Sequence, residues 1–358
     1  MKNRKNEDGS ARLCCSIAAI LLLYAIIMIG TYFGELENRK MLKSNLKNVT
    51  LSSYKGNVTM EELNEQVYKP FGYEIIHPTL PVPTLRMLRQ PSCSTIFSDW
   101  LKISQQPQPV LPPREIPVGL EKAYLLNNYA NVTYRYNNDK NSKAGQKPTD
   151  WNRLSEMMEW GPENITNIGY GREGMSVHYA MKNHSLDGLS GVIIGSMKPW
   201  VEILALQNGA KHLLTVEYNQ LNIQPEFQDR MDSIFPTEIA ENWEKYADSF
   251  DFAASFSSIE HSGIGRYGDP MDPIGDLREM QKVRCLLKKG GLFFFGAPTG
   301  IDAILFNLHR IYGPIRFAMM MTGYELVDVF TEHRPEAMDL KTDNPFLRRQ
   351  KTLVLRKV

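Results

Sequence analysis

Short apolar runs and amphipathic stretches alternate along the C-terminal half of the chain, which is typical of strands that alternate with helices. Gly191–Gly195 is an apolar run that ends in glycine, the form of a buried parallel strand. Pro199–Asn208 carries apolar residues at helical spacing, and Leu213–Val216 is a second apolar run that Glu217 closes. The pattern predicts a strand, turn, helix and strand unit of about 27 residues.

The same alternation continues to the C-terminus. Phe250–Ser257 and Leu292–Gly296 are predicted to be buried strands, with an amphipathic helix over Asp276–Leu287 that Lys288–Gly291 ends. Weaker patterns predict strands at Met231–Phe235, Tyr324–Phe330 and Lys351–Leu355 and a helix at Glu238–Tyr246. Together these elements predict an α/β fold with a doubly wound, mostly parallel sheet.

An uncharged segment lies near the N-terminus. Leu13–Gly34 is rich in Leu, Ile and Ala, and at 1.5 Å per helical residue it spans roughly 30 Å, the thickness of a bilayer core. A cleaved signal peptide would have a shorter apolar run, and a buried soluble helix would have a polar face. We therefore expect residues 1–12 to be a short tail and residues 13–34 an uncleaved signal anchor that binds the lipid bilayer as a single-pass transmembrane helix.

Orientation across the membrane is not decided by charge, because four basic residues precede the apolar segment and four follow it closely. Acceptor sequences for N-glycosylation occur five times, at Asn48, Asn57, Asn131, Asn164 and Asn183. They favour a glycoprotein whose globular part lies in the lumen of the secretory pathway, in the Golgi or the endoplasmic reticulum.

The region between the apolar segment and the strands is predicted to be a stem and linker, residues 35–117. Prolines are dense from Pro70 to Pro117, which predicts an extended chain without helix or central strand. The α/β domain is predicted over residues 118–358, with its core at 187–358. Within it, Asp150–Trp160 is expected to be a helix with Asp150 as its N-cap, and Asn127–Lys147 and Gly169–Gly174 are expected to be loops.

Composition excludes some classes of function. The chain has 358 residues, with 41 Lys and Arg against 40 Asp and Glu, and no basic block, so no nucleic-acid partner is expected. The four cysteines lack the paired spacing of a zinc site, so no metal is expected. Cys14 and Cys15 are either acylated or simply apolar residues at the membrane edge. Cys93 and Cys285 could form a disulfide, but Cys285 lies on an apolar helix face, which favours buried free thiols.

One spacing points to a ligand. Glu217 lies about 22 residues after Gly195, across the predicted strand, turn, helix and strand unit. Such a unit binds nucleotide-like ligands, because backbone N–H groups of the turn face the polar part of the ligand and the acid accepts hydrogen bonds from two ribose hydroxyls.

Two sequence segments carry a family resemblance. FDFAASFSSIEH, followed by a helix and LLKKGGLFFF, resembles the fourth and fifth strands of class I S-adenosylmethionine-dependent methyltransferases, a Rossmann-related fold. The run from Ser257 to Pro270 is similar to the hallmark of an uncharacterised methyltransferase-like family with nematode and plant members. The resemblance covers roughly Trp151 to Val358.

The resemblance implies S-adenosylmethionine as cofactor and assigns site residues position by position. Gly195 and Ser196 match the first turn, which faces the methionine part, and Glu217 matches the acid that holds the ribose. The residues that match the end of the fourth strand, which borders both donor and acceptor, are Ser257, Ser258, Glu260 and His261.

Residues after the fourth strand are candidates for the acceptor side. His261 is a candidate base because its ordinary pKa lies near neutrality, and Asp269 and Asp272 are candidates for orienting the acceptor. Arg266 and Tyr267 are candidates for substrate contact. Each has a structural alternative: a histidine fixed by a backbone carbonyl, a turn aspartate, or an arginine that braces the loop.

Three functions remain open on the sequence alone. The first is a membrane-anchored methyltransferase whose acceptor is a small molecule, a glycan or a protein. The second is a catalytically inactive binding or scaffolding module, which is favoured by a first turn, Gly195–Met197, that lacks the family's acid and second glycine. The third is a nicotinamide-dependent oxidoreductase.

Overall fold

The computed structural model describes residues 24, 28, 45–106, 111–137, 148–267, 269–347 and 349–358. The predicted tail and transmembrane segment, with Cys14 and Cys15, therefore lie almost entirely outside the described residues. Within the described part, no helix is both long enough and apolar enough to cross a bilayer.

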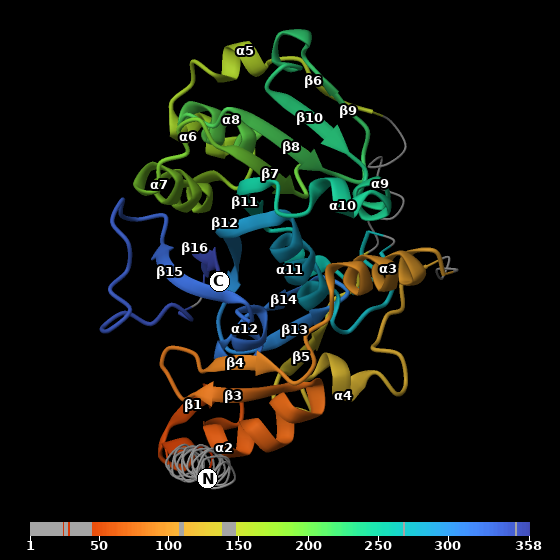
Figure 1. The fold of residues 1–358 in the computed structure, drawn as a ribbon, viewed down its shortest axis with the longest axis vertical. Coiled ribbons are helices and arrows are strands. Elements are labelled where there is room, and N and C mark those ends of the chain that lie inside the picture. The colour runs from red at the N-terminus through yellow and green to blue at the C-terminus, as the bar shows by residue number, and fades with distance from the viewer. Residues whose placement is uncertain are drawn as a thin grey trace, which may run out of the picture.

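A seven-stranded sheet forms the centre of the molecule (Figure 1), in the order β10-β8-β7-β11-β12-β16-β15. The neighbours from β10 to β12 pair in parallel, and β16 is antiparallel to both β12 and β15. The strands span β7 Ser190–Ile194, β8 His212–Val216, β10 Met231–Ile234, β11 Phe250–Phe256, β12 Leu287–Thr299, β15 Tyr324–Phe330 and β16 Arg349–Lys357. The predicted α/β class and mostly parallel sheet are thus confirmed, with β11 and β12 as its fourth and fifth strands in chain order.

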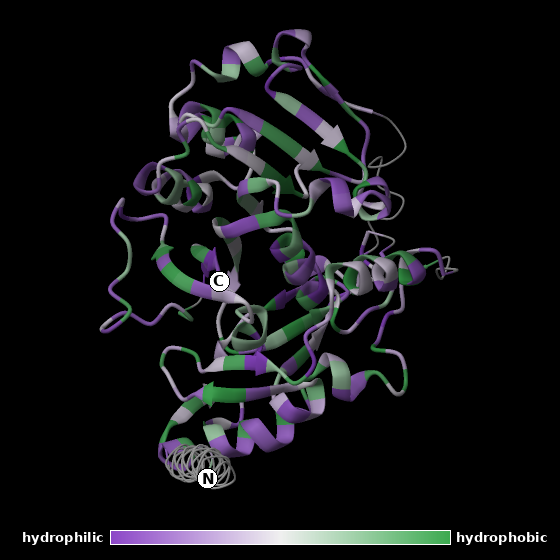
Figure 2. Ribbon diagram, viewed as in Figure 1, coloured by the Kyte–Doolittle hydropathy of each residue, from purple (hydrophilic) through white to green (hydrophobic). Residues whose placement is uncertain are grey.

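Both faces of the sheet are buried, because successive side chains of a strand point to opposite sides. On β12, Phe293 and Phe295 pack into one hydrophobic cluster, whereas Phe294 packs into the other. On β16, Leu353 and Leu355 join the first cluster and Val354 joins the second. Figure 2 shows the hydrophobic residues that run along these central strands. The fold is therefore a sheet between two helical layers.

Each layer has its own set of helices. The helices that pack in the first cluster are α3 Cys93–Ser104, α9 Pro236–Glu241, α11 Gly275–Leu286 and α12 Pro314–Met320. Those in the second cluster are α5 Leu154–Met157, α6 Pro162–Asn167, α7 Met175–Asn183 and α8 Trp200–Gln207.

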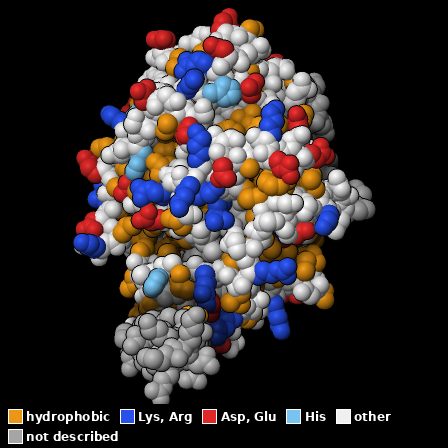
Figure 3. Space-filling view, in the orientation of Figure 1, with side chains coloured by type: hydrophobic (Ala, Val, Ile, Leu, Met, Phe, Trp, Pro, Cys, Tyr) orange, Lys and Arg blue, Asp and Glu red, His pale blue; other side chains and the backbone are white. Residues whose placement is uncertain are grey.

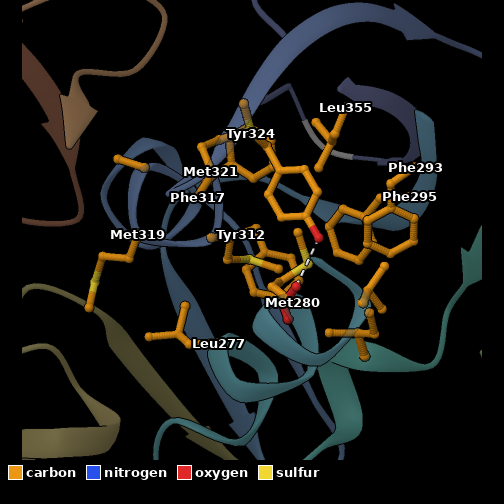
Figure 4. Close-up of a cluster of buried hydrophobic side chains, with 14 of the residues drawn as sticks. Leu277, Met280, Phe293, Phe295, Tyr312, Phe317, Met319, Met321, Tyr324 and Leu355 are labelled. Carbon is orange, nitrogen blue, oxygen red and sulfur yellow. Dashed lines mark hydrogen bonds between the residues drawn. The ribbon is translucent and has the colours of Figure 1, made fainter. Parts of the chain in front are cut away.

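Aromatic and Met side chains fill the space between α11, α12 and the sheet (Figure 4). Tyr324 is buried there, and its hydroxyl donates a hydrogen bond to the Met280 carbonyl at 2.8 Å. A buried phenol needs such a partner. This contact joins β15 to the middle of α11.

The N-terminal segment packs on this sheet rather than leading away from it. Its elements are β1 Thr50–Ser53, β2 Gly56–Thr59, α2 Met60–Leu63, η1 Asn64–Tyr68, η2 Lys69–Phe71, β3 Tyr73–His77, β4 Thr84–Met87, α4 Glu121–Tyr124 and β5 Asn131–Tyr134. Side chains such as Met60, Leu63 and Tyr68 are fully buried in the first cluster. The prediction of a separate stem and linker over residues 35–117 is wrong for the described residues from 45 onward.

The expectation of an extended chain from Pro70 to Pro117 is also wrong where α3 forms. Ser92 caps the helix by accepting a hydrogen bond from the Thr95 N–H at 3.1 Å. Ile96, Phe97 and Trp100 then form one buried face. The density of prolines hid this spacing, since the prolines flank the helix and none lies inside it.

A disulfide joins Cys93 at the start of α3 to Cys285 on α11, with Cα atoms 5.8 Å apart. The prediction of two buried free thiols is therefore wrong. The apolar face of α11 that carries Cys285 is the face that α3 covers. Cys285 is therefore both buried and close enough to Cys93 to form the disulfide.

Some predicted boundaries differ. Asp150 is not an N-cap: it lies in β6 Thr149–Trp151, which pairs in parallel with β9 Leu221–Ile223, and its carboxylate accepts a hydrogen bond from Asn222. The predicted helix over 238–246 is split at Asn242 into α9 and α10 Trp243–Tyr246. The smaller remaining elements are η3 Gly171–Gly174, η4 Pro225–Phe227, η5 Ile259–His261, β13 Ala303–Phe306 and β14 His309–Ile311.

Candidate functional site

A cavity of about 790 Å³ opens at the carboxyl ends of β7, β8 and β11. Between β7 and β11 the order of the sheet reverses, because β8 follows on one side and β12 on the other. Ligands of open α/β sheets bind at this switch point. The volume lies in the range of sites that enclose a drug-sized molecule.

The first turn of the cavity is built around Gly195. Its φ of +71° is the left-handed region that favours glycine. A Cβ atom at this position would overlap the side chain of Ser258, which comes from the end of β11. The turn after β7 and the end of β11 therefore meet in direct contact, and Gly195 and Ser258 both line the cavity.

Glu217 lies at the end of β8 with its carboxylate at the cavity wall. One oxygen, Oε1, accepts hydrogen bonds from the Tyr218 and Asn219 N–H groups and from the Asn219 side chain at 2.8–3.2 Å. Burial raises the pKa of Glu217, and these bonds, with one from the Ser196 backbone, oppose the rise. The Oδ1 atom of Asn219 is buried without a hydrogen-bond partner among the described residues. Two acceptors thus stand together where the spacing predicted a ribose.

Glu202 supports the turn from behind. Its Oε2 atom lies 2.9 Å from the Ser196 hydroxyl, and Oε1 accepts a hydrogen bond from Thr215 on β8 at 3.0 Å. Burial raises the pKa of this fully enclosed carboxyl to about 7. The sequence reasoning missed Glu202, although one acid within the apolar helix Trp200–Gln207 is a visible signal.

The end of β11 has an unusual backbone. Ser257 has a φ of +56°, which is costly for a residue with a side chain. Its hydroxyl donates a hydrogen bond to Glu260 Oε1 at 2.7 Å, and its carbonyl accepts one from Tyr170 at 3.4 Å. Ser257 lines the cavity, whereas Glu260 lies behind it, fully buried, with a pKa that burial raises to about 7. Glu260 therefore positions Ser257, and its predicted direct role in cofactor binding has no contact with the cavity to support it.

His261 reaches the cavity with a fixed tautomer. The Leu308 carbonyl lies 2.7 Å from Nδ1 and can only accept, so Nδ1 carries the proton and Nε2 is left as an acceptor. Burial, together with nearby Arg266 and Arg310, lowers the pKa of His261 to about 3. The ring is therefore neutral at physiological pH and can orient a hydroxyl group by accepting its hydrogen bond.

Asp269 organises the loop that follows His261. Its Oδ2 atom accepts hydrogen bonds from the N–H groups of Gly263, Ile264 and Gly265 at 2.8–3.0 Å, and Oδ1 accepts one from Tyr267 at 3.2 Å. Burial raises the pKa of Asp269, and the bonds from Gly263, Gly265 and Tyr267 oppose the rise. The carboxylate shapes the cavity wall, and a catalytic role for it stays a prediction.

The other loop residues are placed as follows. Asp272 lines the cavity and bonds Arg278 at 3.0 Å. Tyr267 lines the cavity with its ring 5.4 Å from the His261 ring. Arg266 lies over the Tyr267 ring and approaches the Leu308 carbonyl at 3.5 Å, outside the cavity lining. The contacts of Arg266 fit a residue that braces the loop.

A buried ionic cluster holds this loop against β14. Arg316 pairs with Asp276 through two hydrogen bonds of 2.5 and 2.7 Å, and Arg310 donates to the Ser262 carbonyl at 2.6 Å. The two arginines hold the pKa of Asp276 below its usual value against its burial. Buried ionic contacts thus hold the loop that follows His261 at this edge of the cavity.

No group of three or more His, Cys, Asp and Glu side chains in the described part of the chain is arranged to hold a metal ion. The five glycosylation acceptors are all exposed, and none lines the cavity. In the view of Figure 3, Lys and Arg side chains are interspersed with Asp and Glu.

The comparisons with known proteins found one matching family model. The model of a family described as Caenorhabditis protein of unknown function, DUF268, matches residues 188–358, which include all seven strands of the sheet. That this family has nematode and plant members stays a prediction. No curated protein matches the chain in sequence.

Solved structures with a similar fold include S-adenosylmethionine-dependent methyltransferases. A Burkholderia thailandensis 1,6-didemethyltoxoflavin-N1-methyltransferase, with bound 1,6-didemethyltoxoflavin and S-adenosylhomocysteine, is 15% identical with a TM-score of 0.36, over 51% of this chain and 76% of that one. A methyltransferase from Mesorhizobium loti is 13% identical with a TM-score of 0.30, over 50% of this chain and 95% of that one.

Proposed function

We propose that this protein is a membrane-anchored, S-adenosylmethionine-dependent methyltransferase-like protein. The observation that carries the proposal is the cavity at the switch point of the sheet, with the Gly195 turn on one side and Glu217 and Asn219 on the other. This is the place and the polarity that an adenosyl ligand needs, since its ribose hydroxyls donate hydrogen bonds to acceptors at the end of the second strand.

The residues present fit the cofactor. The buried, unpartnered Oδ1 of Asn219 and the Glu217 carboxylate provide acceptors on one wall, and Gly195 and Ser196 of the first turn line the same cavity. The cofactor supplies a methyl group already activated on a sulfonium. The protein then needs mainly to position the acceptor and exclude water.

Positioning falls to the loop after β11. His261 offers Nε2 to an acceptor hydroxyl, and Tyr267 borders the same space. With its pKa lowered to about 3, His261 is a weak base, so we assign it orientation of the acceptor rather than proton removal at neutral pH. Asp269 fixes the loop that carries Tyr267.

Calorimetric titration of the whole chain in detergent tests the cofactor assignment. S-Adenosylmethionine is expected to bind, and Glu217→Gln is expected to weaken it by about tenfold or more, because a charged acceptor is lost. Glu226→Gln is the matched control, since Glu226 is exposed and does not line the cavity. Equal weakening by both variants, or none by Glu217→Gln, would refute the assignment.

The same titration separates two alternatives. A catalytically inactive binding module is favoured by the first turn, which lacks the family's acid and has Met197 in place of its second glycine. Absence of heat with S-adenosylmethionine supports that module, and heat with NAD in its place supports a nicotinamide-dependent oxidoreductase.

We also propose that residues 13–34 anchor the protein in the bilayer with its globular part in the lumen of the secretory pathway. The disulfide between Cys93 and Cys285 supports this, because disulfides persist in oxidising compartments. The exposure of Asn48, Asn57, Asn131, Asn164 and Asn183 leaves each acceptor on the surface. Endoglycosidase treatment of the cell-expressed chain is expected to increase its electrophoretic mobility, and an unchanged mobility would contradict the lumenal placement.

A further inference from the structure

One wall of the cavity comes from the N-terminal segment. Phe97, Trp100 and Ile103 on α3 are three residues apart, so they share one helix face, and all three line the cavity. In Figure 1, α3 lies beside α11, to which the disulfide joins it. This wall lies outside the residues that the family model matches. The N-terminal segment therefore adds a surface to the cavity of the α/β core.

The helices that α3 packs against, α9 and α11, continue this apolar surface. Ile239 on α9 and Val283 and Leu286 on α11 line the same cavity. The charges here are paired: Lys282 Nζ lies 2.6 Å from Glu279 Oε1 and 3.9 Å from the centroid of the Trp100 ring. The pair leaves no net charge on this wall, and the ammonium covers part of the indole.

The end of the cavity near His261 presents hydrogen-bond acceptors. Asp269 and Asp272 are carboxylates at its edge, the latter paired with Arg278, and His261 is neutral there with an acceptor nitrogen. Lys198 also lines the cavity, at the turn after β7. A hydroxyl group can donate a hydrogen bond to Nε2 of His261.

We propose that the α3 wall is the acceptor subsite and that it takes a small, uncharged molecule with an aromatic or hydrocarbon body and one hydroxyl group. This rests on the proposed function and narrows its acceptor from a small molecule, glycan or protein to the first of these. A glycan would place several hydroxyls against Phe97, Ile103 and Leu286, where each would lose its hydrogen bonds to water without replacement. The Cys93–Cys285 disulfide holds the wall in place before the ligand binds, so little ordering is needed on binding.

The test uses 2-naphthol as probe and the whole chain in detergent, with and without S-adenosylhomocysteine. Ile103→Asp places a carboxylate in the cavity, and Ser104→Phe fills part of it, since Ser104 also lines the cavity. Each is expected to weaken naphthol binding by at least about tenfold. Gln105→Asp is the matched control, because it adds the same carboxylate to the exposed end of α3. Circular dichroism and S-adenosylmethionine affinity, both expected to be unchanged, show that the variants fold.

Weakening in both cavity variants but not in Gln105→Asp supports the proposal. Naphthol that fails to bind while S-adenosylmethionine binds overturns it, as does tighter binding of methyl maltoside than of naphthol. Wild-type naphthol affinity in both folded cavity variants overturns it as well. Failure of the proposed function gives a different result. In that case S-adenosylmethionine does not bind, but naphthol still binds, and Ile103→Asp and Ser104→Phe still weaken its binding.

Discussion

Breaking the Cys93–Cys285 disulfide is expected to destabilise the protein and release α3 from the cavity. The bridge joins residues 192 apart in sequence, so it constrains a large part of the unfolded chain. The chain-entropy relation for a closed loop of this size gives about 5 kcal/mol at 25 °C, and measured effects are more often about 2–4 kcal/mol. Alanine is the substitution of choice, because it adds no polar group at these partly or fully buried positions.

Urea unfolding followed by tryptophan fluorescence measures this effect in Cys93→Ala, Cys285→Ala and the double variant. Either single change opens the bridge, so the double variant should lose about as much free energy of unfolding as each single variant. A phosphine reductant should lower the stability of the wild-type protein by a similar amount and leave the variants unchanged. Naphthol affinity should fall with reduction, because α3 is no longer tied to α11.

Two outcomes would refute this reasoning. One is a mass-spectrometric peptide map of the unreduced protein that finds free thiols at positions 93 and 285. The other is a double variant whose loss in free energy of unfolding equals the sum of the losses in the two single variants. Two independent buried side chains would give such additive losses, whereas removal of one shared bond would not.

Two further predictions concern the turn after β7. Gly195→Ala should destabilise the protein more than Gly188→Ala. Both glycines have a φ of +71°, and this backbone conformation costs alanine about 1–2 kcal/mol at either position. Only at Gly195 does the new Cβ atom also collide with a neighbour, the Ser258 side chain. Equal losses in thermal unfolding would show that the contact does not matter. Glu202→Gln should reduce the pH dependence of stability. Burial raises the pKa of Glu202 in the folded protein to about 7, so the folded state keeps a proton that the unfolded state releases above about pH 4.5. Between these values the contribution of Glu202 to wild-type stability therefore falls with rising pH, with a limiting slope of about 1.4 kcal/mol per pH unit. An unchanged slope in urea melts from pH 4.5 to 7 would contradict the buried position of this acid.

The strands of the sheet could be predicted because each is a run of apolar residues buried on both faces. Phe250–Phe256 and Ser190–Ile194 can be identified from their own sequences, without knowing which strands they pair with. Gly195 and Ser257, the residues that follow them, mark where a ligand can reach the backbone. The meeting of Gly195 with Ser258 and the place of Glu217 follow from topology once the strands are known. The part of the cavity wall that comes from α3 could not be predicted in this way, because prolines on both sides of the helix dominate the local composition.

Tertiary contacts explain the other differences. Asp150 has the chemistry of an N-cap, but pairing with β9 gives its backbone a strand partner and its side chain a bond to Asn222. Asp269 has the sequence context of an ordinary turn, yet its carboxylate collects four N–H groups from a loop whose path is set by Arg310 and β14. Neither β9 nor Arg310 is near enough in sequence to these aspartates to be visible in a local pattern.

The first turn bears on whether this protein binds its cofactor at all. The sequence lacks the acid that the resembled methyltransferases carry before the turn, and that absence favoured an inactive module. In the structure a carboxyl group does stand at the turn, but it comes from Glu202 on α8 and bonds both the Ser196 hydroxyl and Thr215 of β8. Ser196 lies between Gly195 and Met197, the residue in place of the second glycine, and its hydroxyl donates a hydrogen bond to Glu202, so the protein itself holds the middle of the turn. The absence of the family's acid and second glycine is therefore compatible with a preformed turn. Calorimetry on Glu217→Gln then tests the binding of S-adenosylmethionine rather than the fold of the turn.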